Sequence, residues 1–453
     1  MSRKKKNTPK HLQWRLECLG HTLIEVLAGL LPGPWVFRLG EALGGLVWHF
    51  MPQRRTIILR NLRIAFAGEK DMAEIRRMAK ATFRRTGGNL ISAAHTARLA
   101  PERLGSVIRI ENLELLEQAL AGGRGVVLLL SHMGNWEILS RLIHLFPPGS
   151  RAGAFYRPLN NPLLDARVLA RRQADGTQMF SKRDNPLQVA GFLREGGIVG
   201  ILADQRVGAQ GNGVRFFGRF THASPLPSLL ARRAKSAVLA LSVTSAEPGT
   251  WRAVFMPVEA PHTTANCMAT LEQAMRAGPI DVFWFQERWK VKVPRRGTVR
   301  DWFGADAIGG GGGKPLRVLL WLVDAPADWH LPEIWFHSEV VYEIVLAPGG
   351  GLPSWMPETT TVHHAPMPTS RTAPGKTLAM IDAAAALPVD FLLAPDASIA
   401  LVSAGQQQAI PVISLPSEPP SVHPEPLPAS REVLETNRHA HTTPAAYRRV
   451  ERG

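Results

Sequence analysis

The chain has 453 residues, of which 45% are hydrophobic and 20% are charged. This length predicts two or three domains with a large core, and the composition excludes a disordered or wholly membrane-embedded chain. The 53 Lys and Arg exceed the 37 Asp and Glu by 16 charges, which indicates an acidic partner. Such a partner is a nucleic acid, an anionic membrane surface or an acidic carrier protein. No zinc-finger spacing or RNP-like aromatic pattern occurs, so no nucleic-acid partner is expected.

Residues 1–53 combine a basic run with two apolar stretches. The cations lie between Arg3 and Lys10, the apolar stretches are 19–31 and 35–51, and Pro32-Gly33-Pro34 separates them. A spanning helix needs about 20 mainly apolar residues, and charged residues interrupt both stretches. We therefore expect two short amphipathic helices at the membrane interface, with the cations on the cytoplasmic side. A single tilted span, or buried helices behind a solvated tail, are the alternatives.

Buried strands and helices alternate between residues 54 and 300. Residues 54–100 have helical spacing and 113–122 form a short helix, whereas the apolar runs 125–130, 197–203 and 237–243 are typical of buried strands. This alternation predicts an α/β fold with a mixed sheet covered by helices.

A glycine-rich linker is expected at 301–313, because Gly309–Gly313 are five consecutive glycines. Beyond it, residues 314–415 contain two more apolar runs, Leu316–Val323 and Phe391–Ala394, and predict a small Rossmann-like α/β domain. The stretch 345–375 is expected to form loops. The Pro-, Ser- and His-rich residues 416–453 predict a disordered tail.

The segment Ser131–Glu137, SHMGNWE, directly follows the first predicted strand. Reactive groups of α/β sheets lie at such strand ends. The turn at Gly134 and Asn135 would bring the Glu137 carboxylate to one ring nitrogen of His132. The other nitrogen would then accept a proton from a hydroxyl group. The alternative is a surface histidine beside an unrelated glutamate.

No metal site or disulfide is expected. Cys18 and Cys267 lie far apart in the sequence and fit a reducing compartment. The adjacent His363 and His364 lack a third ligand.

Several blocks together resemble one enzyme family. The segment 131–137 resembles the H-x4-D/E signature of glycerophospholipid-type acyltransferases, and specifically of the late lipid A acyltransferases. The agreeing blocks are RRTIILRNLRIAF (54–66), YRPLNNPLLD (156–165), LREGG (193–197), ADQ (203–205) and FFG (216–218). The resemblance covers residues 10–298. One departure is Gln286, where the family has histidine, and another is glutamate in place of the more usual aspartate at 137.

The resemblance implies a reaction and its participants. A fatty acyl thioester of acyl carrier protein is the co-substrate, without a metal or another cofactor. The acceptor is a lipid A precursor at the cytoplasmic face of the inner membrane. Backbone donors at 134–136 would stabilise the oxyanion. His132 and Glu137 are the expected catalytic pair, Arg157, Asn161, Asp204 and Asn135 the substrate-binding residues, and Phe216 and Phe217 the lining of the acyl groove. Asn161 and Asp204 could equally be turn and cap residues, and the two phenylalanines core residues.

The net positive charge fits these partners, because acyl carrier protein is acidic and lipid A precursors carry phosphates. Three arginine pairs are candidates for that surface, or else plain solvated faces: Arg84 and Arg85, Arg171 and Arg172, Arg232 and Arg233.

The C-terminal segment 395–413 is similar to the nucleotide-sugar half of heptosyltransferase-type glycosyltransferases. Ser398 and Leu401 replace the glycine and histidine of their pattern, which predicts a degenerate domain without activity.

Three alternatives stay open beside the lipid A acyltransferase: an acyltransferase for another membrane sugar lipid, a thioesterase-like hydrolase using the same residues on water, and a non-catalytic membrane-bound module.

Overall fold

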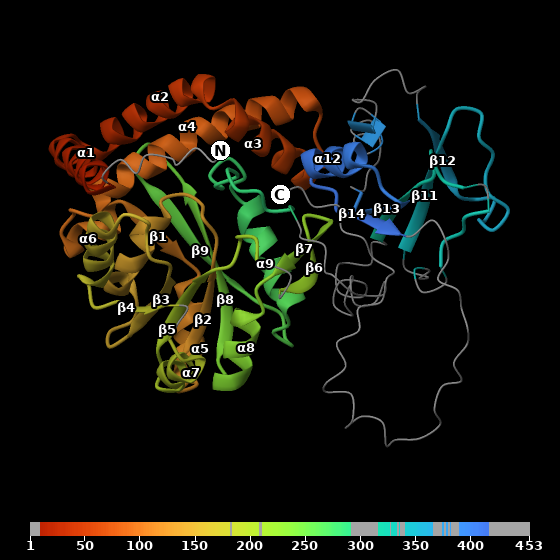
Figure 1. Cartoon of the computed structure of the whole chain (residues 1–453). Coiled ribbons are helices and arrows are strands. Elements are labelled where there is room, and N and C mark those ends of the chain that lie inside the picture. Colours follow the sequence, from red (N-terminus) through yellow and green to blue (C-terminus); the bar gives the residue numbers. More distant parts are fainter. Residues whose placement is uncertain are drawn as a thin grey trace.

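A computed structural model describes the fold (Figure 1). It describes residues 10–181, 184–207 and 211–290, and in the C-terminal part 316–326, 328–332, 335, 340–365, 374–375, 377–378, 381 and 389–415. The basic residues 1–9, the predicted linker 301–313 and the predicted tail 416–453 lie outside the described residues.

Four helices come first and lie along one side of the molecule (Figure 1). They are α1 (Lys10–Leu30), α2 (Gly33–Phe50), α3 (Pro52–Ala65) and α4 (Met72–Thr96). α1 ends where Pro32-Gly33-Pro34 begins, as expected from the sequence. Among the described residues, no helix is both long and apolar enough to cross a membrane.

Helix α2 packs tightly on α4 through small residues. A Cβ atom added at Gly40 would lie 2.5 Å from the carbonyl oxygen of Gly87, and one added at Gly44 would lie 2.2 Å from that of Phe83. The two backbones therefore approach as closely as they do only because these positions are glycine.

A seven-stranded mixed sheet forms the centre of the part before residue 291, in the order β1-β9-β8-β2-β5-β3-β4. Only the pair β8–β9 is antiparallel among the neighbours in this sheet. Its strands are β1 (Ile108–Glu111), β2 (Val126–Leu130), β3 (Ala152–Tyr156), β4 (Gln178–Ser181), β5 (Ile198–Leu202), β8 (Ala237–Ser245) and β9 (Trp251–Pro257). The predicted α/β fold and its three buried strands are confirmed.

Helices cover this sheet, and a separate hairpin projects beside it. The connecting helices are η1 (Pro101–Ser106), α5 (Leu113–Ala121), η2 (Trp136–Leu145), α6 (Pro162–Gln173), α7 (Pro186–Arg194), α8 (Leu226–Ala234) and α9 (Thr264–Arg276). The hairpin consists of β6 (Asn212–Phe216) and β7 (Arg219–Ala223), which pair only with each other in the described structure.

A second sheet, all parallel, forms the C-terminal part, with the order β12-β11-β10-β13-β14. Its elements are β10 (Leu316–Trp321), β11 (Val340–Leu346), β12 (Thr361–His364), β13 (Phe391–Pro395), α12 (Ile399–Gln408) and β14 (Val412–Leu415). The prediction of loops throughout 345–375 is wrong at β12. That strand has no apolar run because its residues are half-buried or exposed at the sheet edge.

Candidate functional site

The central strand β2 leads directly to the candidate site. All five of its residues are buried, and it pairs in parallel with β5 on one side and β8 on the other. The backbone then turns sharply at Gly134, which has φ 55° and donates from its N–H to the carbonyl oxygen of Asp281 at 3.0 Å. A Cβ atom there would lie 2.4 Å from the Val243 carbonyl oxygen, so this turn requires glycine.

Asp204 holds His132 by two hydrogen bonds. Its Oδ1 lies 2.8 Å from His132 Nδ1, and its Oδ2 accepts from the His132 backbone N–H at 3.1 Å. His132 and Asp204 meet because each follows by two residues the carboxyl end of one of two adjacent parallel strands. A carboxylate only accepts, so Nδ1 carries the proton and Nε2 presents its lone pair. The Nε2 atom lies 3.0 Å from the amide nitrogen of the exposed Gln205.

The surroundings of this pair raise the affinity of the His132 ring for a proton. Burial by itself lowers the pKa of His132, but the charge and hydrogen bond of Asp204, with a smaller effect of Glu137, raise it above its usual value. Burial by itself raises the pKa of Asp204, and His132 and Arg288 outweigh that effect and hold it below its usual value. Asp204 therefore stays ionised and stabilises the imidazolium form of its neighbour.

The expectation that Glu137 holds the His132 ring is corrected by this geometry. Glu137 lies in the first turn of η2 and is bound by Arg172 of α6, whose Nη2 donates to both carboxylate oxygens at 2.7 and 3.0 Å. Arg172 Nε also donates to Glu137 Oε2 at 3.2 Å, and the Trp136 indole N–H donates to Glu137 Oε1 at 3.2 Å. Arg172 had been predicted only as part of a basic surface. Its spacing from Glu137, 35 residues, gives no signal of this pairing.

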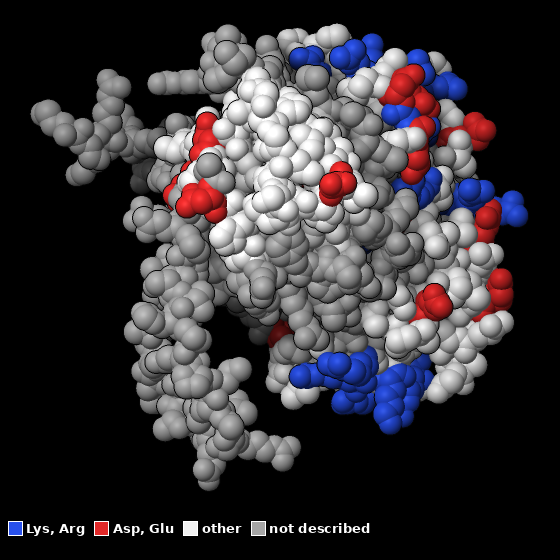
Figure 2. Space-filling view, turned by 90° about the vertical axis from the view of Figure 1, so that its right-hand side faces the viewer, with Lys and Arg blue, Asp and Glu red and all other residues white. Residues whose placement is uncertain are grey.

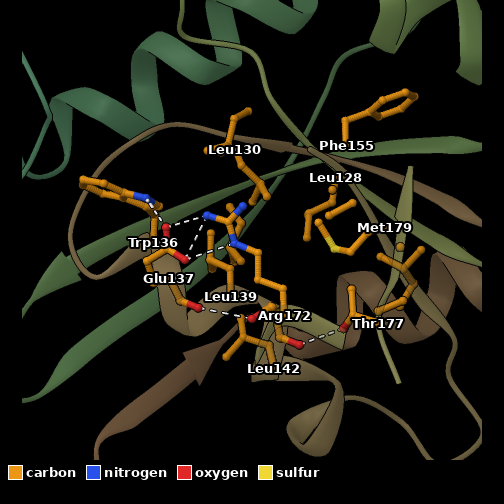
Figure 3. A pocket seen from close by; sticks show the side chains of 18 of the residues that line it. Leu128, Leu130, Trp136, Glu137, Leu139, Leu142, Phe155, Arg172, Thr177 and Met179 are labelled. Carbon is orange, nitrogen blue, oxygen red and sulfur yellow. Dashed lines mark hydrogen bonds and ion pairs between the residues drawn. The ribbon is translucent and has the colours of Figure 1, made fainter. Parts of the chain in front are cut away.

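An apolar cavity of about 90 Å³ lies next to this ion pair (Figure 3). It adjoins the loop that carries His132, since Leu130 and Leu202 line it and Trp136, whose ring centroid is 5.4 Å from that of His132, forms part of its wall. Large apolar side chains of β2, η2, β3 and β4 also line it: Leu128, Leu139, Leu142, Phe155 and Met179. Glu137 and Arg172 are the charged groups of the lining.

Phe216 and Phe217 do not line this cavity, so their prediction as an acyl groove is corrected. They are 0% and 3% exposed and pack against each other with centroids 4.9 Å apart. Phe217 also contacts Trp284 at 5.5 Å. These aromatic residues belong to the core, which was the alternative reading of the same motif.

The remaining predicted substrate ligands divide into one exposed and two buried residues. Arg157 is exposed on the loop directly after β3, at the same edge of the sheet as His132. Asn161 is 5% exposed, caps α6 by accepting from Leu163 N–H at 3.0 Å, and donates to the Trp14 carbonyl oxygen at 3.0 Å. Asn161 is therefore a helix-cap residue, which was the alternative to a substrate-binding role. Asn135 is 1% exposed and donates to Thr96 Oγ1 at 3.0 Å, so its side chain fixes the loop to α4 rather than facing a substrate.

The arginine pairs predicted to form one basic surface lie apart. Arg171 forms an ion pair with Glu25 of α1, and Arg85 with Glu41 of α2. Arg232 and Arg233 are exposed at the end of α8, near the amino ends of the strands and thus opposite His132. Figure 2 shows a compact group of cations at the end of the molecule where Figure 1 places α7 and α8.

Comparison with known proteins identifies the family of the chain. A sequence profile of the bacterial lipid A biosynthesis acyltransferases matches residues 3–291. The chain is 24% identical over 277 residues to a lipid A biosynthesis palmitoleoyltransferase of Escherichia coli (strain K12), covering 58% of this chain and 87% of the relative. It is 26% identical over 279 residues to a lipid A biosynthesis lauroyltransferase of the same organism, covering 59% and 90%. The matched range ends before the C-terminal sheet, so the glycosyltransferase resemblance of that part stays a prediction. The chain belongs to the bacterial lipid A biosynthesis acyltransferase family.

Proposed function

We propose that the chain transfers a fatty acyl group from acyl carrier protein to a hydroxyl of a lipid A precursor, with His132 as the general base and Asp204 as its partner. The observation that carries this proposal is the His132–Asp204 pair beside an apolar cavity, in a chain of this family. His132 Nε2 takes the hydroxyl proton while the hydroxyl oxygen attacks the thioester carbonyl carbon. The carbon–sulfur bond then breaks, and the imidazolium returns the proton to the departing thiolate of the carrier.

For the Glu137–Arg172 pair we infer a different role from the one that the signature suggests. We propose that Glu137 orients Arg172 by its near-bidentate contact, so that the guanidinium lies between the catalytic loop and the cavity. A fixed cation there would stabilise the negative charge that develops on the thioester oxygen. Leucine, phenylalanine and methionine side chains of the same cavity would hold the first part of the acyl chain.

Helices α1 and α2 support binding to the inner membrane. Sixteen of the 23 exposed large hydrophobic side chains among the described residues lie between Leu12 and Met51, so apolar exposure is concentrated on these helices. Such a face fits an interfacial helix pair. Leu159 and Leu163 are also exposed, on either side of Asn161, which is bound to α1. We propose that this edge faces the bilayer and that Arg157, just before Leu159 in the sequence, meets a phosphate of the acceptor.

The test is an assay of purified protein with an acyl carrier protein thioester and a lipid A precursor in mixed micelles. Acylated lipid, detected by mass spectrometry, is the expected product, and His132→Ala should abolish it. Free fatty acid in equal amounts with and without the acceptor would instead establish the hydrolase alternative. A product formed only with a different sugar lipid would establish the other transferase.

A further inference from the structure

Three of the four polar groups of His132 are used inside the protein. Nδ1 and the backbone N–H are bound to Asp204, and the backbone carbonyl oxygen accepts from the Phe283 N–H at 2.7 Å. The ring also lies edge-on to Trp136, with the two centroids 5.4 Å apart. These contacts fix the ring and leave Nε2 as the polar atom that can meet a substrate. The side chain is only 13% exposed, so solvent reaches a small part of the ring.

Gln205 covers this remaining atom. Its amide nitrogen lies 3.0 Å from His132 Nε2. The nitrogen of a carboxamide only donates, and Nε2 only accepts when Nδ1 carries the proton, so the contact is an N–H···N hydrogen bond. The lone pair that would take a hydroxyl proton is therefore occupied by the protein itself. A substrate hydroxyl can reach it only after the amide has moved.

The backbone of Gln205 is held on both sides, whereas its side chain can move. Asp204 before it is buried against His132, and Arg206 after it donates from Nη1 to the Lys290 carbonyl oxygen at 2.8 Å. Gln205 itself is exposed. Exposed side chains change rotamer within nanoseconds, so a rotation about the side-chain bonds can release Nε2 while the loop stays in place.

We propose that Gln205 is a specificity-determining residue that keeps water from using His132 until the lipid acceptor is bound. This inference rests on the proposed function, in which Nε2 is the base. In hydrolysis, Nε2 would take a proton from water while the water oxygen attacks the thioester carbonyl carbon. The carbon–sulfur bond would then break and the carrier thiolate would take the proton, which yields a fatty acid and the carrier thiol.

Water and the lipid acceptor differ in what they gain when they displace the Gln205 amide. A water molecule brings no contacts beyond those of its own oxygen. A phosphorylated lipid also binds through groups far from the reacting hydroxyl, and this binding can offset the lost hydrogen bond between Gln205 and His132. The amide therefore disfavours the smaller nucleophile more than the larger one.

Gln205→Met tests this inference in the full chain, because methionine keeps the length of the side chain and removes the donor. Without acceptor, the release of fatty acid from the carrier thioester should rise about two- to tenfold, the range for one hydrogen bond between neutral groups. The KM for the lipid acceptor should fall by a similar factor, because its hydroxyl no longer competes with the amide. Gln188→Met is the control, since Gln188 is exposed on α7, the helix that leads into β5, whereas Gln205 follows that strand.

Gln205→Glu provides a second kinetic test. A carboxylate can only accept, so it would hold a proton on Nε2 and favour the imidazolium. The acid limb of kcat/KM should move to higher pH, with about a tenfold loss at pH 6 and a smaller loss at pH 8. The other charged groups that act on His132 are Asp204, Glu137 and Arg172, which this variant leaves in place.

A chemical readout does not depend on turnover. Diethyl pyrocarbonate modifies the unprotonated nitrogen of histidine, so His132 should be modified about two- to tenfold faster in Gln205→Met, as followed by mass spectrometry of its peptide. Unchanged rates of modification and of hydrolysis would overturn the inference. Equal losses of hydrolysis and transfer would also overturn it, because Gln205 would then assist the reaction. If the wild-type chain forms no acylated lipid but Gln205→Met still accelerates the modification, the proposed function fails and the role of Gln205 stands.

Discussion

Replacing Asp204 by asparagine tests the assignment of the catalytic pair most directly. The change removes a charge that accepts two hydrogen bonds from His132, one to the ring and one to the backbone. Only the bond to the ring becomes stronger when the ring is charged, and a hydrogen bond to a charged group contributes about 1.5–3 kcal/mol, so the imidazolium formed during the reaction loses roughly that amount. This corresponds to a decrease of kcat by about 10 to 10². The measurement is the initial rate of lipid acylation with the carrier thioester in excess.

The pH dependence of the Asp204→Asn activity tests the direction in which Asp204 changes the pKa of His132. Asp204 raises the pKa of His132 against the opposing effect of burial. The neutral ring is the base, so wild-type activity rises with pH through that raised pKa. Without the carboxylate this limb should move to lower pH. Glu137→Gln is the matched comparison, since it changes the other carboxylate, and its limb should move less. An Asp204→Asn protein with wild-type kcat, alongside a Glu137→Gln protein without activity, would refute the geometry and restore Glu137 as the orienting group.

Three further predictions concern the cavity, the membrane face and the helix packing. Met179→Trp should fill part of the cavity and shorten the acyl chain that is transferred most rapidly, which competition between carrier thioesters of different lengths measures. Leu19→Asp combined with Leu23→Asp, both exposed on α1, should weaken binding to anionic vesicles in a flotation assay by about tenfold, whereas Leu187→Asp on α7 should not. Gly44→Leu should lower the free energy of unfolding by about 3 kcal/mol or more in urea, because its side chain meets the Phe83 carbonyl, whereas Gly20→Ala, with open space around it, should not destabilise the protein.

Much of the fold is predictable because its signals are local. The run Val126–Leu130 is apolar without interruption because all five residues of this central strand are buried, on both faces of the sheet. The break between α1 and α2 is likewise predicted by Pro32-Gly33-Pro34. β12 gives no such signal. It is a short edge strand, and its pairing with β11 depends on where the chain returns in space.

The partner of His132 was not predictable from spacing alone. Glu137 is five residues away in the sequence, but η2 directs its carboxylate toward Arg172 of α6. Asp204 is 72 residues away and reaches the ring because β5 lies beside β2. A sequence indicates that a strand ends before Asp204, but the order of strands in the sheet decides which two loops meet. The resemblance predicts Asp204 as a substrate-binding residue, with a turn or cap residue as the alternative, and neither interpretation places it on the His132 ring.

The ion pair between α1 and α6 joins the proposed membrane face to the helix that carries Arg172. Glu25 lies on the buried side of α1 and is 5% exposed. It accepts a hydrogen bond from Arg167 at 2.9 Å and forms an ion pair with Arg171, which directly precedes Arg172 in α6. Glu25→Gln should lower the free energy of unfolding by about 1–3 kcal/mol, between the values for exposed and buried pairs, because Arg167 is partly exposed.

Helix α6 would then be less firmly held, so the KM for the lipid acceptor should rise more than the KM for the carrier thioester. Urea unfolding and steady-state kinetics on mixed micelles measure the two effects. Glu41→Gln on α2 is the control, since its ion pair with Arg85 lies on helices that do not include α6. Equal changes in both variants would mean that the Glu25 pair contributes only general stability. A selective rise in the acceptor KM would instead support a membrane helix that also holds the active site in register.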